Sequence, residues 1–120
     1  MTTINKVMLI GHIGKTPEYR KLDGDVSVVS FPLATSVTIK REGKPVEETE
    51  WHNIVLWREV ADAASQVLEK GKLVYIEGKL HTRSFEKDGI KRYATEIIAQ
   101  NFTLLGRKSD FAPPADEVAV

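Results

Sequence analysis

Residues 49–58 read Thr-Glu-Trp-His-Asn-Ile-Val-Leu-Trp-Arg, and the organisation of the chain can be worked out from this segment. Successive side chains of a β-strand point to opposite faces, so Trp51 and Trp57 share one face while Ile54 and Leu56 share the other. At about 3.3 Å per residue, the two indoles stand about 20 Å apart. That span fits several stacked bases better than one small substrate.

A competing interpretation makes both tryptophans ordinary core residues of the strand. The opposite face already offers Ile54 and Leu56 to a core, and the tryptophan face also carries Asn53. A polar amide is costly to bury without a hydrogen-bond partner. We therefore predict that the tryptophan face points outward.

Composition limits the classes of protein that this chain can belong to. With 120 residues, of which 42% are hydrophobic, the chain suits one domain with its own core. It has no cysteine, which excludes disulfides and thiolate metal sites. The apolar run Val7–Ile10 is too short for a signal peptide or a membrane span, so we expect a cytoplasmic, soluble protein with no membrane partner.

Charge is balanced, with 17 Lys and Arg residues against 17 Asp and Glu residues. A protein that only coats nucleic acid with positive charge is usually basic. If nucleic acid is the partner, stacking must therefore supply much of the affinity.

Strand and helix patterns flank the opening segment on both sides. Glycines end a β-prone run over residues 4–13, and residues 26–37 alternate with an aliphatic and aromatic side at odd positions, where Phe31 is expected in the core. The spacing of apolar residues after Trp57 predicts one helix from Glu59 to Lys70. Alternation returns over residues 73–85, and the turn signal Lys87-Asp88-Gly89 predicts a partner strand over residues 90–105.

Two segments are expected to lack regular structure. Gly43 and Pro45 interrupt the run from Ile39 to Glu48, which we predict to be a basic, mobile hairpin loop. Residues 107–120 have no periodic apolar face and contain Pro113-Pro114, so we predict a disordered tail after a folded domain of residues 1–106.

The resulting order is three strands, one helix and two strands. A mainly β chain with strong bends and a single helix between strands three and four is typical of the OB fold, a five-stranded Greek-key barrel that binds oligonucleotides or oligosaccharides. Fold alone does not establish function.

Aromatic rings beside basic residues favour single-stranded nucleic acid as the ligand. Bases stack on exposed rings at about 1–3 kcal/mol each, while cations follow the phosphates. The expected stacking residues are Trp51, Trp57 and Phe85. The expected phosphate contacts are the nearby basic residues Lys40, Arg41, Lys44, Lys79 and Arg83.

Catalytic and metal sites find little support. Gly14-Lys15-Thr16 resembles the end of a phosphate-binding loop, but Leu9 stands where the first glycine is needed and Pro17 follows where a helix should begin. The three histidines lack metal-ligand spacing. We therefore expect no enzyme activity, metal or cofactor.

Two further functions stay open at this point. An OB-fold adaptor could use the aromatic face to dock proteins in a replication or conjugation complex, and a sugar-binding module could use the same rings. Quenching of tryptophan emission by oligothymidine would separate nucleic-acid binding from an adaptor role.

Several motifs, in this order, resemble the bacterial single-stranded DNA-binding protein family. They are Asn5-Lys6-Val7, Gly11-His12-Ile13-Gly14-Lys15-Thr16-Pro17-Glu18, Leu33-Ala34-Thr35-Ser36, Thr49-Glu50-Trp51-His52, Val74-Tyr75-Ile76-Glu77-Gly78 and Thr82-Arg83. The resemblance implies an OB fold, assembled as a homotetramer, that binds single-stranded DNA in replication, recombination and repair at the bacterial nucleoid.

The resemblance also implies roles for individual residues. Trp51, Trp57 and Phe85 match base-stacking positions, and the subunit contacts implied are Lys6, Met8, Ile10, His52 and Tyr75. The chain departs from the family at Ile39, where a stacking tryptophan is common, and at Glu59, where a lysine is frequent. It ends Asp116-Glu117-Val118-Ala119-Val120 without the family's acidic tip, so recruitment of partner proteins through that tip is not expected.

Overall fold

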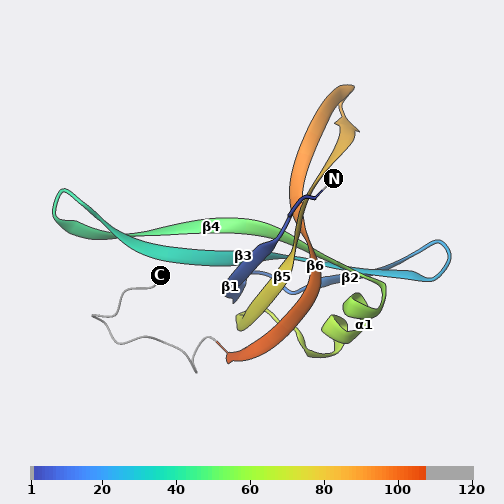
Figure 1. The fold of residues 1–120 in the computed structure, drawn as a ribbon, viewed down its shortest axis with the longest axis horizontal. Helices are drawn as coiled ribbons and strands as arrows, with labels where there is room; N and C mark the ends of the chain where they lie inside the picture. The colour runs from blue at the N-terminus through green and yellow to red at the C-terminus, as the bar shows by residue number, and fades with distance from the viewer. Residues whose placement is uncertain (1, 108–120) are drawn as a thin grey trace.

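The computed structural model describes residues 2–107, which form six strands and one helix. The elements are β1 (Val7–Ile13), β2 (Glu18–Leu22), β3 (Val26–Arg41), β4 (Lys44–Trp57), α1 (Arg58–Val67), β5 (Lys72–Lys87) and β6 (Ile90–Arg107). The strands make one curled sheet in the order β1-β5-β6-β4-β3-β2. Figure 1 shows that three hairpins project from this central body, with α1 set against one side of it.

Curling brings the two ends of the sheet together into a barrel. β1 pairs antiparallel with β5 and also with β3, through His12 opposite Ala34 and Ile13 opposite Leu33. β4 and β6 run parallel over Ile54 opposite Ile97 and one further pair. Each of these two seams is only two residue pairs long, so the barrel is not cleanly closed. The predicted OB fold is confirmed.

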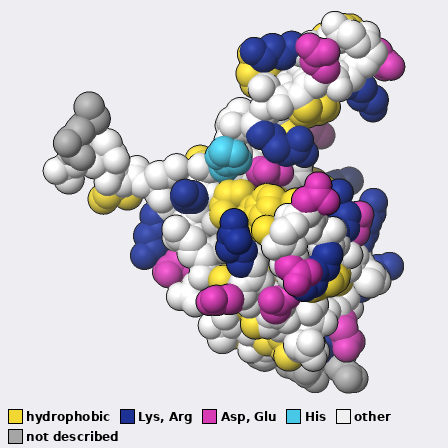
Figure 2. Space-filling view, turned by 90° about the vertical axis from the view of Figure 1, so that its right-hand side faces the viewer, with side chains coloured by type: hydrophobic (Ala, Val, Ile, Leu, Met, Phe, Trp, Pro, Cys, Tyr) yellow, Lys and Arg dark blue, Asp and Glu magenta, His cyan; other side chains and the backbone are white. Residues whose placement is uncertain are grey.

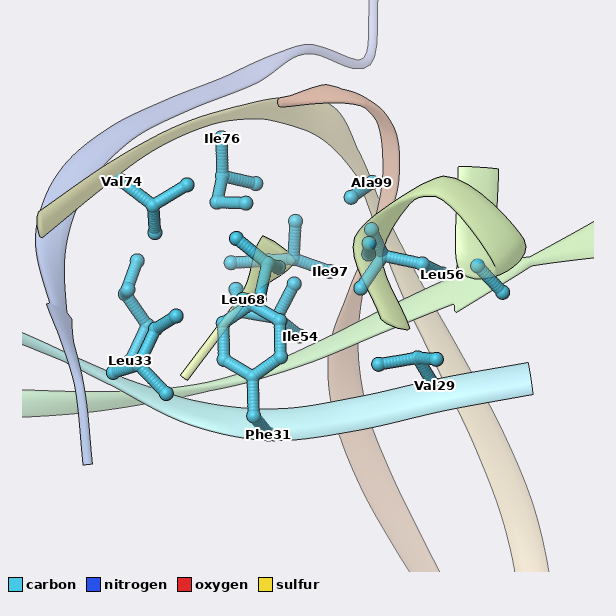
Figure 3. Packing of buried hydrophobic residues seen from close by; sticks show 13 residues of the cluster. Val29, Phe31, Leu33, Ile54, Leu56, Leu68, Val74, Ile76, Ile97 and Ala99 are labelled. Atoms are coloured by element: carbon cyan, nitrogen blue, oxygen red, sulfur yellow. The ribbon is translucent and has the colours of Figure 1, made fainter. Parts of the chain in front are cut away.

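The core fills the barrel with alternate side chains from β3, β4, β5 and β6. Figure 3 shows these side chains pointing toward one another from the surrounding strands and from the segment after α1. The residues labelled there are Val29, Phe31, Leu33, Ile54, Leu56, Leu68, Val74, Ile76, Ile97 and Ala99, all of which are buried. Of the odd positions of β3 predicted on the core side, Val29, Phe31 and Leu33 are buried, as expected. Beyond them the prediction is wrong, because Thr35 is only partly buried and Val37 is 40% exposed where the strand leaves the barrel.

α1 is shorter than expected, running from Arg58 to Val67 instead of from Glu59 to Lys70. Its small residues Ala61 and Ala64 are fully buried, which lets the helix lie close against β3, β4 and β6. The backbone then leaves the helix with Leu68 in an extended conformation, and this turn places the Leu68 side chain in the core. α1 is the only helix among residues 2–107, and it is too short to cross a membrane.

The sequence did not reveal β2. All five of its residues are exposed, so no buried face produces an alternating pattern. Its backbone pairs with β3 from Glu18 opposite Ser30 to Leu22 opposite Val26. The Tyr19 hydroxyl also lies 3.1 Å from the Asp62 carboxylate of α1. The strand count is therefore six and not the expected five.

The predicted loop from Ile39 to Glu48 is also corrected. β3 and β4 stay paired as far as Arg41 opposite Lys44, and only Glu42 and Gly43 form the turn. Both turn residues have positive φ, 53° and 77°, as a two-residue hairpin turn of type I′ requires. We call residues 36–49 the β3–β4 arm and residues 81–96 the β5–β6 arm; neither contains a buried residue.

Pro32 lies inside β3 and pairs with Asn53 of β4 in unbroken register. The β2 ladder stops at Ser30, and Pro32 takes part in backbone hydrogen bonding there as an acceptor, because its carbonyl oxygen accepts from the Gly14 N–H at 2.9 Å. β6 includes Arg107, and the rest of the expected tail lies outside the described residues.

Gly78 provides a stability test of the barrel. A Cβ at this position would lie 2.1 Å from the Ile98 carbonyl oxygen on β6, because the two backbones approach closely at a register shift. We predict that Gly78→Ala lowers the free energy of unfolding by about 1–3 kcal/mol, measured by urea denaturation at one fixed protein concentration.

Ser84→Ala is the matched control, since Ser84 is exposed on the same strand. It should change the free energy of unfolding by less than about 0.5 kcal/mol. Equal unfolding midpoints for the two variants would contradict the close approach at Gly78.

Candidate nucleic-acid interface

Two tryptophans stand on the outer face of β4 because the inner face is committed to the core. Ile54 and Leu56 are 0% exposed, whereas Trp51 is 58% and Trp57 38% exposed. The outward orientation predicted for the tryptophans is therefore confirmed. Both rings are accessible to a flat ligand.

The Trp51 ring rests against the backbone of Gly14. A Cβ at Gly14 would lie 2.4 Å from the Cζ3 atom of the indole. Gly14 is itself fixed because its N–H donates to the Pro32 carbonyl at 2.9 Å. The glycine thus supports one side of the ring, a relation that no local sequence pattern indicates.

A groove of about 320 Å³ opens on this outer face. Asn53 and Val55 lie between Trp51 and Trp57 on the same face of β4, and both help to line the groove. The other lining residues come from the β5–β6 arm, from β3, and from β2 and the segment that joins it to β1. Its charged lining residues are Lys15, Glu18, Arg83 and Glu96.

Phe85 is half-buried and does not present a bare ring. The guanidinium carbon of Arg83 lies 5.3 Å from the centre of the Phe85 ring, within range of a cation–π contact. Arg83 Nε also donates to Glu96 Oε2 at 3.3 Å. Arg83, a predicted phosphate contact, therefore lies against the ring of Phe85, a predicted stacking residue.

The register separates the basic residues of the β3–β4 arm. Lys40 and Ala34 are an even number of positions apart on β3, so their side chains point to the same face. Ala34 pairs with Trp51, and Lys40 therefore lies on the tryptophan side of the ribbon. Arg41 and Lys44 pair with each other on the opposite side, where Arg41 donates to Glu48 at 2.7 Å. Within residues 2–107, Lys40 and Lys79 form no ion pair.

Charges of both signs cover the surface. Figure 2 shows Lys and Arg side chains interspersed with Asp and Glu on the face that it presents. That face has no single basic field, as the balanced composition predicts. Any affinity for a polyanion must therefore come from local groups.

A second groove, of about 430 Å³, brings together the residues expected at a subunit contact. Met8 and Ile10 on β1 line it with Tyr75 on β5, and both β1 side chains are more than half exposed. His52 lies outside this lining, but its Nε2 atom is 2.8 Å from the Oγ1 atom of Thr35, which does line the groove.

A polar network borders this second groove. Glu77 accepts a hydrogen bond from the Tyr75 hydroxyl at 3.0 Å and pairs with Lys6 at 3.3 Å. The Tyr75 hydrogen bond, followed by Lys6, holds the pKa of the Glu77 carboxyl below its usual range. Its contribution to stability is therefore present above the ordinary carboxyl pKa and is lost as the pH falls through the lowered value.

The rest of the described chain offers no metal site. Residues 2–107 contain no group of three or more His, Asp or Glu side chains that could hold an ion. The aromatic face and its groove are thus the best-developed candidate site.

Comparisons with known proteins point to one family. The model of the single-strand binding protein family matches residues 4–105. The single-stranded DNA-binding protein 1 of Chlorobaculum tepidum is 50% identical over 116 residues, which cover 94% of this chain and 72% of that protein. A single-stranded DNA-binding protein of Neisseria meningitidis is 44% identical over 110 residues, covering 90% of this chain and 63% of the relative.

Solved structures agree with these relatives. A Plasmodium falciparum SSB in complex with ssDNA superimposes with a TM-score of 0.80 at 33% identity, covering 88% of this chain and 97% of that one. A deletion mutant of the single-stranded DNA binding protein from Thermus aquaticus gives 0.75 at 31% identity, covering 85% and 50%.

The contact between Gly14 and Trp51 can be tested by fluorescence. Gly14→Ala in a Trp57→Phe background leaves Trp51 as the single reporter. The new Cβ must displace the exposed indole from the backbone, so we predict a red-shifted emission maximum with a change in stability below about 1 kcal/mol.

The matched control is Gly14→Ala in a Trp51→Phe background, where only Trp57 emits. Its spectrum should not move. Identical shifts in both backgrounds would show a general disturbance and refute the specific contact.

Proposed function

The chain belongs to the single-strand binding protein family, and from this we propose that it binds single-stranded DNA with little sequence preference, protecting it during replication, recombination and repair. The observation that carries the proposal is the pair of exposed tryptophans on one face of β4, beside a groove. Flat rings accept every base, because every base has a π-face. This role needs no catalytic step and no cofactor.

Stacking is the main source of affinity in this proposal. Trp51 and Trp57 each take a base, at about 1–3 kcal/mol per base. Phe85 contributes through the surface that Arg83 leaves uncovered. Because the formal net charge is zero, long-range attraction of the phosphates is weak.

Phosphate contacts follow the sidedness of the arms. Lys40 is on the tryptophan side of its ribbon, and Lys79 and Arg83 share one face of β5. We therefore propose these three residues as the principal phosphate contacts. Arg41 and Lys44 reach the strand only at the tip of the β3–β4 arm, where both sides of the ribbon are open.

We also propose that the working form is a homotetramer in the cytoplasm, at the nucleoid. Met8 and Ile10 expose apolar surface on β1, with Tyr75 beside them and Lys6 and His52 at the margins. Stacking at two or three rings per subunit gives weak binding alone. Several subunits on one strand raise the affinity by multivalency.

Replacement of a stacking tryptophan tests the DNA-binding surface. We predict that Trp51→Ala or Trp57→Ala weakens binding of a short oligothymidine by about 5- to 140-fold, the equivalent of 1–3 kcal/mol. Titration of the unmodified protein should quench its tryptophan emission. An adaptor that uses this face for proteins would show no quenching.

Tyr93→Ala is the control for loss of an exposed aromatic ring. Tyr93 is 67% exposed and pairs with Ser84, so it lies on the side of the β5–β6 arm opposite to Phe85. Its removal should leave the dissociation constant within about twofold. Losses as large as those at Trp51 would remove the distinction between the two surfaces.

A charge at Ile10 tests the subunit contact. We predict that Ile10→Glu lowers the mass in solution, measured by sedimentation equilibrium, because a carboxylate buried between subunits has no partner. Ile90→Glu is the matched control, since the two isoleucines are 57% and 56% exposed. An unchanged assembly in both variants would place the contact elsewhere.

A further inference from the structure

We propose that the groove beside the two tryptophans holds the edge of a base and favours cytosine over thymine, with Glu96 as the residue that determines the preference. This inference rests on the proposed binding of single-stranded DNA and names the bases that the groove prefers. It adds a modest selectivity to a surface whose stacking is indifferent to sequence.

The charge inside the groove favours bases over phosphates. Two cations line it, Lys15 and Arg83, and two carboxylates, Glu18 and Glu96, balance them. A phosphate entering this space would meet as much repulsion as attraction, so the phosphate contact proposed for Arg83 is made from outside the groove. A base carries no charge and meets no such repulsion, provided that hydrogen bonds in the groove replace those that its edge makes to water.

The other lining groups suit the flat, polar-edged shape of a base. Pro32, Val55 and Ala94 provide apolar contact, while Ser30 and Asn53 provide a hydroxyl and an amide. Asn53 is exposed between the two tryptophans on β4. A nucleotide between two stacked neighbours can therefore turn its base edge into the groove.

Glu96 and Arg83 place an acceptor beside a donor. The Glu96 side chain is only 12% exposed, and its Oε2 atom accepts from Arg83 Nε at 3.3 Å. An ionised carboxylate can only accept hydrogen bonds. The terminal nitrogens of Arg83 take part in none of the hydrogen bonds found within residues 2–107 and remain available as donors.

Cytosine matches this order of groups, and thymine does not. The amino group of cytosine donates, as a carboxylate requires, and the adjacent ring nitrogen accepts, as a guanidinium requires. Thymine presents a carbonyl oxygen in place of the amino group, which would face the carboxylate with no proton between them. A buried acceptor left without a donor is costly, so thymine is disfavoured.

The pair is held in place before DNA arrives. Arg83 lies over the Phe85 ring, with its guanidinium carbon 5.3 Å from the ring centre, and Glu96 fixes it from the other strand of the arm. Groups that are already ordered lose less entropy on binding. Glu96 therefore acts both as an acceptor for the base and as a positioning residue for Arg83.

Glu96→Gln tests the proposal through a ratio of affinities. The substitution keeps the shape of the side chain, and its amide can donate to thymine. We expect the ratio of the dissociation constants of oligothymidine and oligocytidine to fall by about fivefold or more relative to the unmodified protein. The ratio is used because the two homopolymers also differ in flexibility and self-stacking.

Glu18→Gln is the matched control, because it removes the same charge from the same groove at a side chain that is 71% exposed. It should change both affinities by one factor and leave the ratio unchanged. A ratio that stays constant in Glu96→Gln, or moves equally in Glu18→Gln, would overturn the proposal.

A second measurement uses the unmodified protein and so does not depend on the folding of a variant. Replacing the cytosines of the oligonucleotide by 2-pyrimidinone removes only the amino group. We expect binding to weaken by about fivefold or more, and equal affinity would refute the role of the amino donor. Absence of quenching by every oligonucleotide would instead refute the proposed DNA binding itself.

Discussion

The whole binding surface depends on the packing of β3 against β4 inside the barrel. Phe31 and Leu33 of one strand meet Ile54 and Leu56 of the other, and all four are buried. Because strand side chains alternate, this commitment of one face to the core forces the other face outward. Trp51 and Trp57 are exposed as a consequence, at a spacing fixed by the rise of the strand. A slip of one residue would bury the tryptophans and expose the core.

The arms extend the barrel without a core of their own. Neither arm contains a buried residue, so backbone pairing and cross-strand side-chain contacts hold them. Examples are the hydrogen bond between the Ser36 and Thr49 hydroxyls at 2.9 Å and the ion pair of Arg83 with Glu96. Such pairs contribute fractions of a kcal/mol each. In the proposed function, the arms follow a strand of DNA while the barrel keeps the rings of Trp51 and Trp57 in fixed positions.

Electrostatics shapes how this family member meets its ligand. The chain has no net charge, and the groove between the tryptophans and the β5–β6 arm balances two cations with two carboxylates. The aromatic rings and the hydrogen-bonding groups must then do what a basic surface does in other nucleic-acid-binding proteins. Arg83 takes part in several of these interactions, since it contacts the Phe85 ring and the Glu96 carboxylate and also lines the groove.

The sequence by itself determined the features that depend on local periodicity. These include the inward and outward faces of β3 and β4, the existence of the helix, and the rings available for stacking. It did not reveal β2, because an edge strand without a buried face leaves no pattern. The run from Ile39 to Glu48 was predicted to be a loop, because Gly43 and Pro45 usually interrupt strands. In the structure, Gly43 lies in the hairpin turn and Pro45 lies near the start of β4.

Only the tertiary structure decided which distant residues meet. The support of Trp51 by Gly14, the separation of Lys40 from Arg41 and Lys44, and the pairing of Arg83 with Glu96 all follow from strand register and barrel closure. Register depends on the pairing of whole strands, and closure on contacts between the two ends of the sheet. Neither quantity is recorded in the order of neighbouring residues, so the detail of the site appeared only once the barrel was assembled.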